Sequence, residues 1–185
     1  DCGPSCLAMI VKFYGLQPNI EVIRHTCALS REGVSLLGIS KAAESIGFKT
    51  ISGRLSFNTL VTEAPLPCIV HWNQNHFIVV HKIKKIKKRQ YAFYVADPAR
   101  GMVSYNREEF CEHWVSTKTN GEEKGIVLLL EPTEQLYSQQ NQDVISIKSR
   151  VGFLWKYIKT YKNFFTQLIL GLLLGSLLQL IFPFL

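Results

Sequence analysis

The hydrophobic pattern of the N-terminal segment predicts three helices. Proline is favoured at the first positions of a helix and glycine just beyond its end, and an asparagine or serine side chain caps the first free backbone N–H groups. On these signals the helices run from Gly3-Pro4 to Gly15, from Asn19 to about Leu29, and from Ser35 to Ile46, with Gly47 as the stop.

Short runs rich in β-branched and aromatic residues follow, each broken by turn residues, as is typical of strands. The predicted strands cover Lys49–Leu55, Pro67–Trp72, Phe77–Ile83, Tyr91–Ala96 and Gly125–Leu130, with a short helix at 107–115. Helices followed by antiparallel strands make an α+β fold, and about 130 residues can bury one core. We therefore expect one folded domain over residues 1–132, with the helices packed on the sheet.

The segment after this domain changes character twice. Residues 133–147 are mostly polar and predict a linker. Residues 148–162 predict an amphipathic helix suited to a membrane surface, since apolar and aromatic residues repeat at helical spacing opposite lysines. The apolar positions are Val151, Leu154, Trp155, Ile158 and Tyr161, and the lysines are Lys156, Lys159 and Lys162. The alternative is an amphipathic helix packed within a soluble protein.

Residues 163–185 contain no charged side chain. A stretch of about 20 apolar residues is long enough to span a bilayer, so we expect one transmembrane helix here. The alternative is a fully buried helix of a soluble protein. Basic residues on its N-terminal flank favour a cytoplasmic position for the preceding domain. The chain begins at Asp1 rather than Met and ends on apolar residues, so we expect both ends to be truncated.

The net charge of +7 is unevenly distributed. Residues 1–143 hold 16 basic and 14 acidic side chains, whereas residues 144–185 hold five basic and no acidic ones. Six of the 16 lie in the run Lys82–Arg89, which we interpret as a solvated hairpin tip, with a membrane or leader contact as the alternative. A nucleic-acid surface requires a broad basic face, so no nucleic-acid partner is expected.

The five cysteines form no CxxC pair, which argues against a zinc ribbon or a thioredoxin-type site, and no metal is expected. Their odd number favours a reducing compartment and buried thiols. They are Cys2, Cys6, Cys27, Cys68 and Cys111. A redox pairing of Cys6 with Cys2 is the alternative to a core role for Cys6.

One cysteine is a candidate nucleophile. Cys2 stands at a helix start, where free N–H groups and the helix dipole favour a thiolate. Such a thiol needs a base and a group that orients the base. His76 begins an apolar strand, and Asp97 ends the strand that could pair beside it. Taken singly, such residues are more often structural: a structural thiol, a partly buried histidine and an Asp-Pro turn.

Motifs around these residues resemble a known family. The run Asp1–Ile10, with Phe13-Tyr14-Gly15 after it, closely resembles the nucleophile motif of double-glycine leader peptidase domains, the bacteriocin-processing cysteine peptidases of ABC exporters. His76–Val80 resembles that family's histidine motif and Val95–Gly101 its aspartate motif. Gly33–Gly38 resembles the loop and helix that follow the second helix, so the resemblance covers residues 1–131.

The resemblance implies a papain-like cysteine peptidase in which Cys2 is the nucleophile, His76 the base and later the acid, and Asp97 the orienting group. The implied substrate is a secreted, bacteriocin-like peptide precursor, cut after a Gly-Gly or Gly-Ala pair, whose leader binds as an amphipathic helix in an apolar groove. The implied setting is a multi-pass cell-membrane exporter, with the peptidase domain on the cytoplasmic side. The protein would act as a homodimer of half-transporters, with ATP and Mg²⁺ needed only by an ATPase domain outside this chain.

Family members also carry a Gln shortly before the Cys, which helps to hold the oxyanion, and this chain starts too late to include it. Loss of one such donor typically lowers the rate by about 10²–10³. One alternative function is a non-hydrolytic docking domain of a secretion transporter, although such domains lack the nucleophile. Another is a membrane-anchored peptidase without a transporter. No phosphate-binding GxxxxGK[ST] motif occurs in the sequence.

Overall fold

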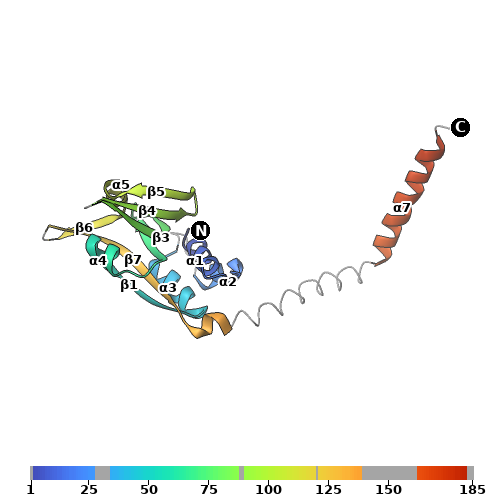
Figure 1. The fold of residues 1–185 in the computed structure, drawn as a ribbon. Helices are drawn as coiled ribbons and strands as arrows, with labels where there is room; N and C mark the ends of the chain where they lie inside the picture. The colour runs from blue at the N-terminus through green and yellow to red at the C-terminus, as the bar shows by residue number, and fades with distance from the viewer. Residues whose placement is uncertain (1, 28–33, 88–89, 120, 139–161, 183–185) are drawn as a thin grey trace. The chain divides into compact units, whose positions relative to one another are not determined.

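A computed structural model describes residues 2–27, 34–87, 90–119, 121–138 and 162–182. The chain divides into two compact units, Asp1–Gln140 and Asn141–Leu185. The first unit is an antiparallel sheet with helices on both of its faces (Figure 1).

The helices of the first unit begin and end close to the predicted positions. They are α1 (Cys2–Phe13), α2 (Ile20–Thr26), α3 (Leu36–Ser45), α4 (Phe57–Thr62) and α5 (Arg107–Trp114). The two predicted caps are confirmed: the Asn19 side chain accepts the Val22 N–H, and the Ser35 hydroxyl accepts the Gly38 N–H. The helix α4 was not predicted, because its six residues are too few for a periodic pattern.

The sheet has seven strands in the order β1-β7-β2-β3-β4-β5, with β6 also paired to β7, and every pairing is antiparallel. The strands are β1 (Phe48–Ser56), β2 (Cys68–Trp72), β3 (His76–Lys87), β4 (Gln90–Asp97), β5 (Gly101–Asn106), β6 (Val115–Thr119) and β7 (Glu122–Pro132). The predicted α+β fold with an antiparallel sheet is therefore confirmed. The unpredicted strands, β5 and β6, contain no fully buried residue among those described and so lack an apolar signal.

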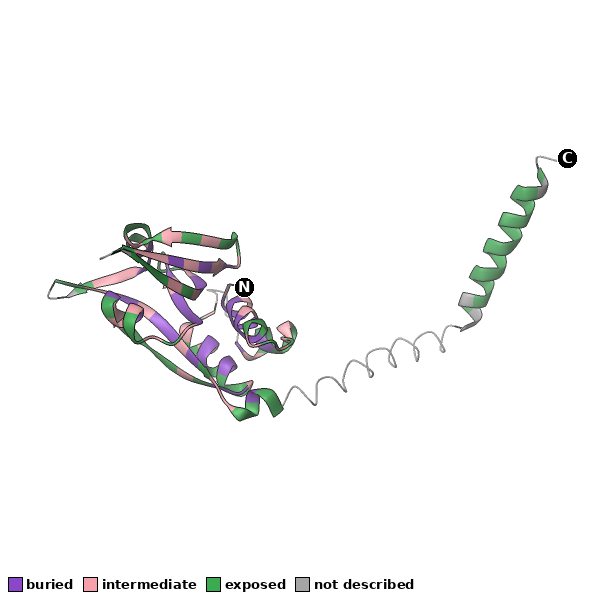
Figure 2. Cartoon of the chain, in the orientation of Figure 1, coloured by how far each residue is buried: buried purple, intermediate pink, exposed green. Residues whose placement is uncertain are grey.

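Each face of the sheet carries its own hydrophobic cluster. Leu7 of α1 and Ile39 of α3 pack with Phe77 on one face, whereas Phe93 and Phe110 stack on the other with ring centroids 4.0 Å apart. Buried residues therefore occupy both the inner side of α1 and the central strands (Figure 2). Because its two faces are covered, β3 is held firmly at the end where it begins.

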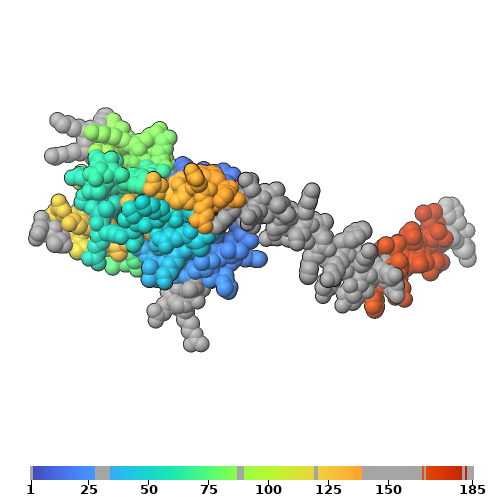
Figure 3. Space-filling view, turned by 90° about the horizontal axis from the view of Figure 1, so that it is seen from below, coloured from blue at the N-terminus to red at the C-terminus, as the bar shows by residue number. Residues whose placement is uncertain are grey.

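The folded unit extends past residue 132, where the predicted domain ended. Residues 134–138 are helical, and Leu136 is buried in the cluster formed by the N-terminal helices. The N–H and the hydroxyl of Thr133 both donate to the carbonyl of Gly47, at 3.0 and 2.6 Å. Figure 3 shows this orange segment lying on the cyan part of the domain.

Gly47 makes this contact possible, and Gly47→Ala should lower the free energy of unfolding by about 2 kcal/mol or more. The residue has φ +100°, and a Cβ there would collide with the backbone of Leu136. Gly53→Ala is the matched control, since a Cβ at Gly53 meets no atom within 4 Å. Urea unfolding of the two variants measures the difference, and equal effects would contradict the packing described.

The second unit contains the helix α7 (Lys162–Ile181), in which Phe164 and the leucines are exposed. Within the described part of the chain, no helix combines the length and the apolarity that a membrane crossing requires. The transmembrane helix predicted over 163–185 is thus not confirmed. Most of the predicted linker and of the amphipathic helix at 148–162 lies outside the described residues.

Candidate active site

Cys2 is the first residue of α1, as the sequence predicted for a candidate nucleophile, and it is partly exposed. The backbone N–H groups of the first helical turn have no partner within the helix and therefore favour negative charge at this end. The four other cysteines are buried, which agrees with their predicted core role. Cys2 is therefore the most accessible of the five cysteines.

A buried thiol joins α1 to the strand that carries His76. The Cys6 S–H donates to the backbone carbonyl of Phe77 at 3.1 Å. Burial raises the pKa of Cys6, and nearby charge on Cys2 and Asp97 raises it further. Cys6 thus lies near two of the three candidate site residues, Cys2 on α1 and Asp97 on β4.

His76 and Asp97 contact each other directly. His76 is the first residue of β3 and Asp97 the last of β4, and these strands pair in the sheet. The Nε2 atom of His76 lies 2.8 Å from Oδ1 of Asp97. The His76 side chain is 24% exposed and that of Asp97 only 6%. With Nε2 engaged by the carboxylate, Nδ1 is the ring nitrogen left for a second partner.

The surroundings of Asp97 favour its charged form. Burial by itself raises the pKa of Asp97, but hydrogen bonds from His76 and from the Ala99 N–H outweigh it, with help from the charges of His76 and Arg100. The Ala99 N–H donates to Oδ1 at 2.8 Å. The net result is a pKa below the ordinary value of 3.8, so the carboxylate is ionised at neutral pH.

This lowered pKa predicts an acid-sensitive part of the stability. Because the folded pKa of Asp97 lies below the unfolded one, its contribution is present at neutral pH and is lost as pH falls through the folded value, below 3.8. Urea unfolding of the wild type and of Asp97→Asn between pH 7 and pH 3 measures it. We expect the difference between the two free energies of unfolding to shrink toward acid pH. A difference independent of pH would contradict the assignment.

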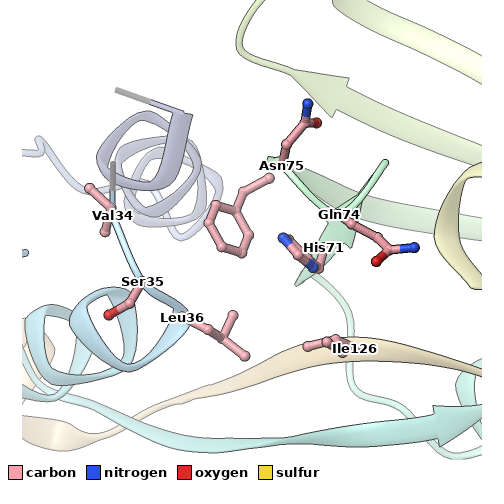
Figure 4. A pocket seen from close by; sticks show the side chains of 8 residues that line it. Val34, Ser35, Leu36, His71, Gln74, Asn75 and Ile126 are labelled. Atoms are coloured by element: carbon pink, nitrogen blue, oxygen red, sulfur yellow. The ribbon is translucent and has the colours of Figure 1, made fainter. Parts of the chain in front are cut away.

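A pocket of about 340 Å³ opens between the segment that leads into α3 and the sheet (Figure 4). Its walls are part apolar and part polar: Val34, Ser35, Leu36, His71, Gln74, Asn75, Phe77 and Ile126. Burial lowers the pKa of His71, whose ring lies 5.0 Å from that of Phe77. No local sequence pattern predicts this pocket, because its residues come from four separate segments that only the fold brings together.

The sequence profile of the peptidase C39 family matches residues 1–134. The chain belongs to the peptidase C39 family. This confirms the predicted membership among the double-glycine leader peptidase domains, and with it the assignment to a cysteine peptidase family.

Curated relatives of this C39 domain are longer proteins. One is the colicin V secretion/processing ATP-binding protein CvaB of Escherichia coli, 30% identical over 165 residues, which are 89% of this chain and 22% of CvaB. Another is the lactococcin-G-processing and transport ATP-binding protein LagD of Lactococcus lactis subsp. lactis, 33% identical over 119 residues, or 62% of this chain and 16% of LagD. The chain thus spans about a fifth of the length of these relatives.

Two solved structures resemble this C39 domain. One is a double-glycine motif protease from an AMS/PCAT transporter in complex with the leader peptide, with 34% identity and a TM-score of 0.57, covering 72% of this chain and 85% of that one. The other is the peptidase domain of Streptococcus ComA, a bifunctional ABC transporter, with 27% identity and a TM-score of 0.54, covering 72% and 92%. The predicted papain-like fold is confirmed.

Proposed function

We propose that this C39 domain removes the leader from secreted, bacteriocin-like peptide precursors by cutting after a Gly-Gly type pair. The observation that carries the proposal is the 2.8 Å pairing of His76 with an ionised Asp97. The hydrogen bond from Cys6 to Phe77 ties the strand that begins at His76 to the helix that begins at Cys2. A nucleophile, a base and an orienting carboxylate are the parts that thiol-dependent peptide cleavage requires.

In the proposed reaction, Nδ1 of His76 takes the proton of the Cys2 thiol as Sγ attacks the carbonyl carbon of the second Gly. The tetrahedral intermediate collapses when His76 returns that proton to the leaving amine, which frees the mature peptide and leaves the leader as a thioester on Cys2. His76 then deprotonates a water molecule, and the attack of that water releases the leader acid and restores the thiol. Asp97 holds the imidazole through Nε2 and stabilises its positive charge in each step.

We propose that the pocket beside Phe77 receives an apolar side chain of the leader. Val34, Leu36 and Ile126 supply apolar walls. Burial lowers the pKa of His71, and a neutral imidazole has a smaller desolvation penalty than a charged one when a ligand covers it. An amphipathic leader helix would place such side chains at regular spacing. Glycine at the cut site would fit a narrow passage to Cys2.

For the whole protein we propose an exporter in the cell membrane, acting as a homodimer of half-transporters with the peptidase domain on the cytoplasmic side. The names of the relatives support transport and ATP use, with ATP and Mg²⁺ bound outside this chain. A membrane role for residues 163–185 rests on their uncharged sequence and on the exposed leucines of α7.

The test uses the full-length protein and two synthetic precursors, one with a Gly-Gly pair before the mature peptide and one with Gly-Val. We expect products whose masses place the cut after the second Gly, and at least a hundredfold slower cleavage of the Gly-Val peptide, on the order of what a steric misfit at the reacting centre costs. Tight binding without cleavage of either peptide would instead support the docking-domain alternative.

A further inference from the structure

Two residues of the turn that precedes His76 have an unfavourable backbone conformation. Asn73 and Gln74 both lie in the left-handed region, with φ values of +48° and +58°. The Asn75 N–H donates to the Trp72 carbonyl at 3.2 Å and closes the turn. Residues other than glycine seldom adopt this conformation, so it persists only where the surrounding structure holds it. In this hairpin, the turn determines where β3 begins and therefore where His76 stands.

Two hydrogen bonds join this turn to α5. The Asn73 N–H donates to the backbone carbonyl of His113 at 2.9 Å, and Nδ1 of His113 donates to Oδ1 of Asn73 at 2.8 Å. The carbonyl belongs to the last turn of α5, where helix carbonyls lack partners within the helix. The His113 ring also packs 5.0 Å from the Trp72 ring. We name the paired side chains of Asn73 and His113 the clamp.

The backbone around His76 is thus fixed from two sides. On the N-terminal side the clamp ties the turn to α5, and on the C-terminal side the Cys6 thiol ties Phe77 to α1. The imidazole of His76 is held by Asp97. A shift of the turn would move the base away from the helix that carries Cys2, although neither clamp residue belongs to the proposed triad.

We infer that His113 and Asn73 are positioning residues for the proposed base, acting only through the turn that places His76. This inference rests on the proposed peptidase function. It assigns to α5, which lies on the opposite face of the sheet from α1, a defined part in keeping the site assembled.

The test compares variants of the full-length protein by two readouts: kcat for the Gly-Gly precursor, and the rate at which iodoacetamide alkylates Cys2, followed by mass spectrometry. His113→Ala removes the donor, whereas His113→Asn replaces it with an amide N–H at a similar position. Asn73→Gly keeps a residue that tolerates positive φ but loses the acceptor. His25→Ala, at an exposed site on α2, is the matched control.

We expect His113→Ala and Asn73→Gly to slow both readouts about tenfold, since small misplacements of a catalytic group are costly. The double variant should be no slower than either, because both changes break one interaction. His113→Asn should return both rates to within about threefold of the wild type. If His113→Ala does not fold, Asn73→Gly and His113→Asn carry the test.

Unchanged kcat and alkylation in folded Asn73→Gly or His113→Ala would overturn the inference, as would a His113→Asn variant no faster than His113→Ala. Failure of the proposed function looks different, because the wild type itself would then leave the precursor uncut. The alkylation rates would still show whether the clamp affects the reactivity of Cys2.

Discussion

Replacing Cys2 with alanine should abolish precursor cleavage, lowering kcat by a factor on the order of 10⁵ or more, while the affinity for the leader changes less than about threefold. In the proposed reaction the thiol of Cys2 supplies the attacking atom, and the four other cysteines are buried. In the proposal the leader binds in the pocket beside Phe77, and Cys2 does not line that pocket.

The measurement pairs single-turnover cleavage with calorimetric titration of the leader into Cys2→Ala. Cys111→Ala is the control, because Cys111 is a buried thiol in the cluster on the other face of the sheet and should leave both values unchanged. Retained cleavage in Cys2→Ala would remove Cys2 from the role of nucleophile.

The second large effect concerns the base and its carboxylate. We expect His76→Ala to lower kcat by about 10³–10⁴, because it removes the general base. We expect Asp97→Asn to lower kcat by about 10²–10⁴, because it removes the carboxylate that orients the imidazole. The two residues share one hydrogen bond, so their effects should not add. A double variant as slow as His76→Ala alone is the expected result.

Steady-state rates of the two single variants and the double variant measure this, with His25→Ala as the control at an exposed histidine. If the double variant loses the sum of both single effects on a free-energy scale, the residues act independently, and the role proposed for Asp97 is wrong.

Much of this fold is predictable from local chemistry. The caps at Asn19 and Ser35 and the glycine after α3 determine the ends of helices, and the central strands are apolar because both faces of the sheet are covered. By contrast, β5 is an edge strand with no buried residue, and Leu136 is a single aliphatic residue in a polar stretch. Periodicity therefore predicts neither β5 nor the folding of residues 133–138 onto the domain.

Some residues of the site are likewise predictable from the sequence, and others are not. Cys2 at a helix start, His76 at a strand start and Asp97 at a strand end are each visible in the sequence as a reactive type at an element boundary. The pocket around His71 and the contact between Asn73 and His113 are not, because they join residues far apart in the chain through no local pattern. The positive φ at Asn73 leaves only a weak signal, since asparagine tolerates that conformation better than most residues.

The most direct measurement of the central claim uses a synthetic leader that ends in a Gly-Gly chloromethyl ketone, incubated with the full-length protein. The account predicts one covalent adduct, formed as the thiolate displaces chloride, and tandem mass spectrometry should place it on Cys2. A scrambled leader with the same ending should react far more slowly. An adduct on another residue, or equal rates for both peptides, would contradict a leader-directed peptidase with Cys2 as its nucleophile.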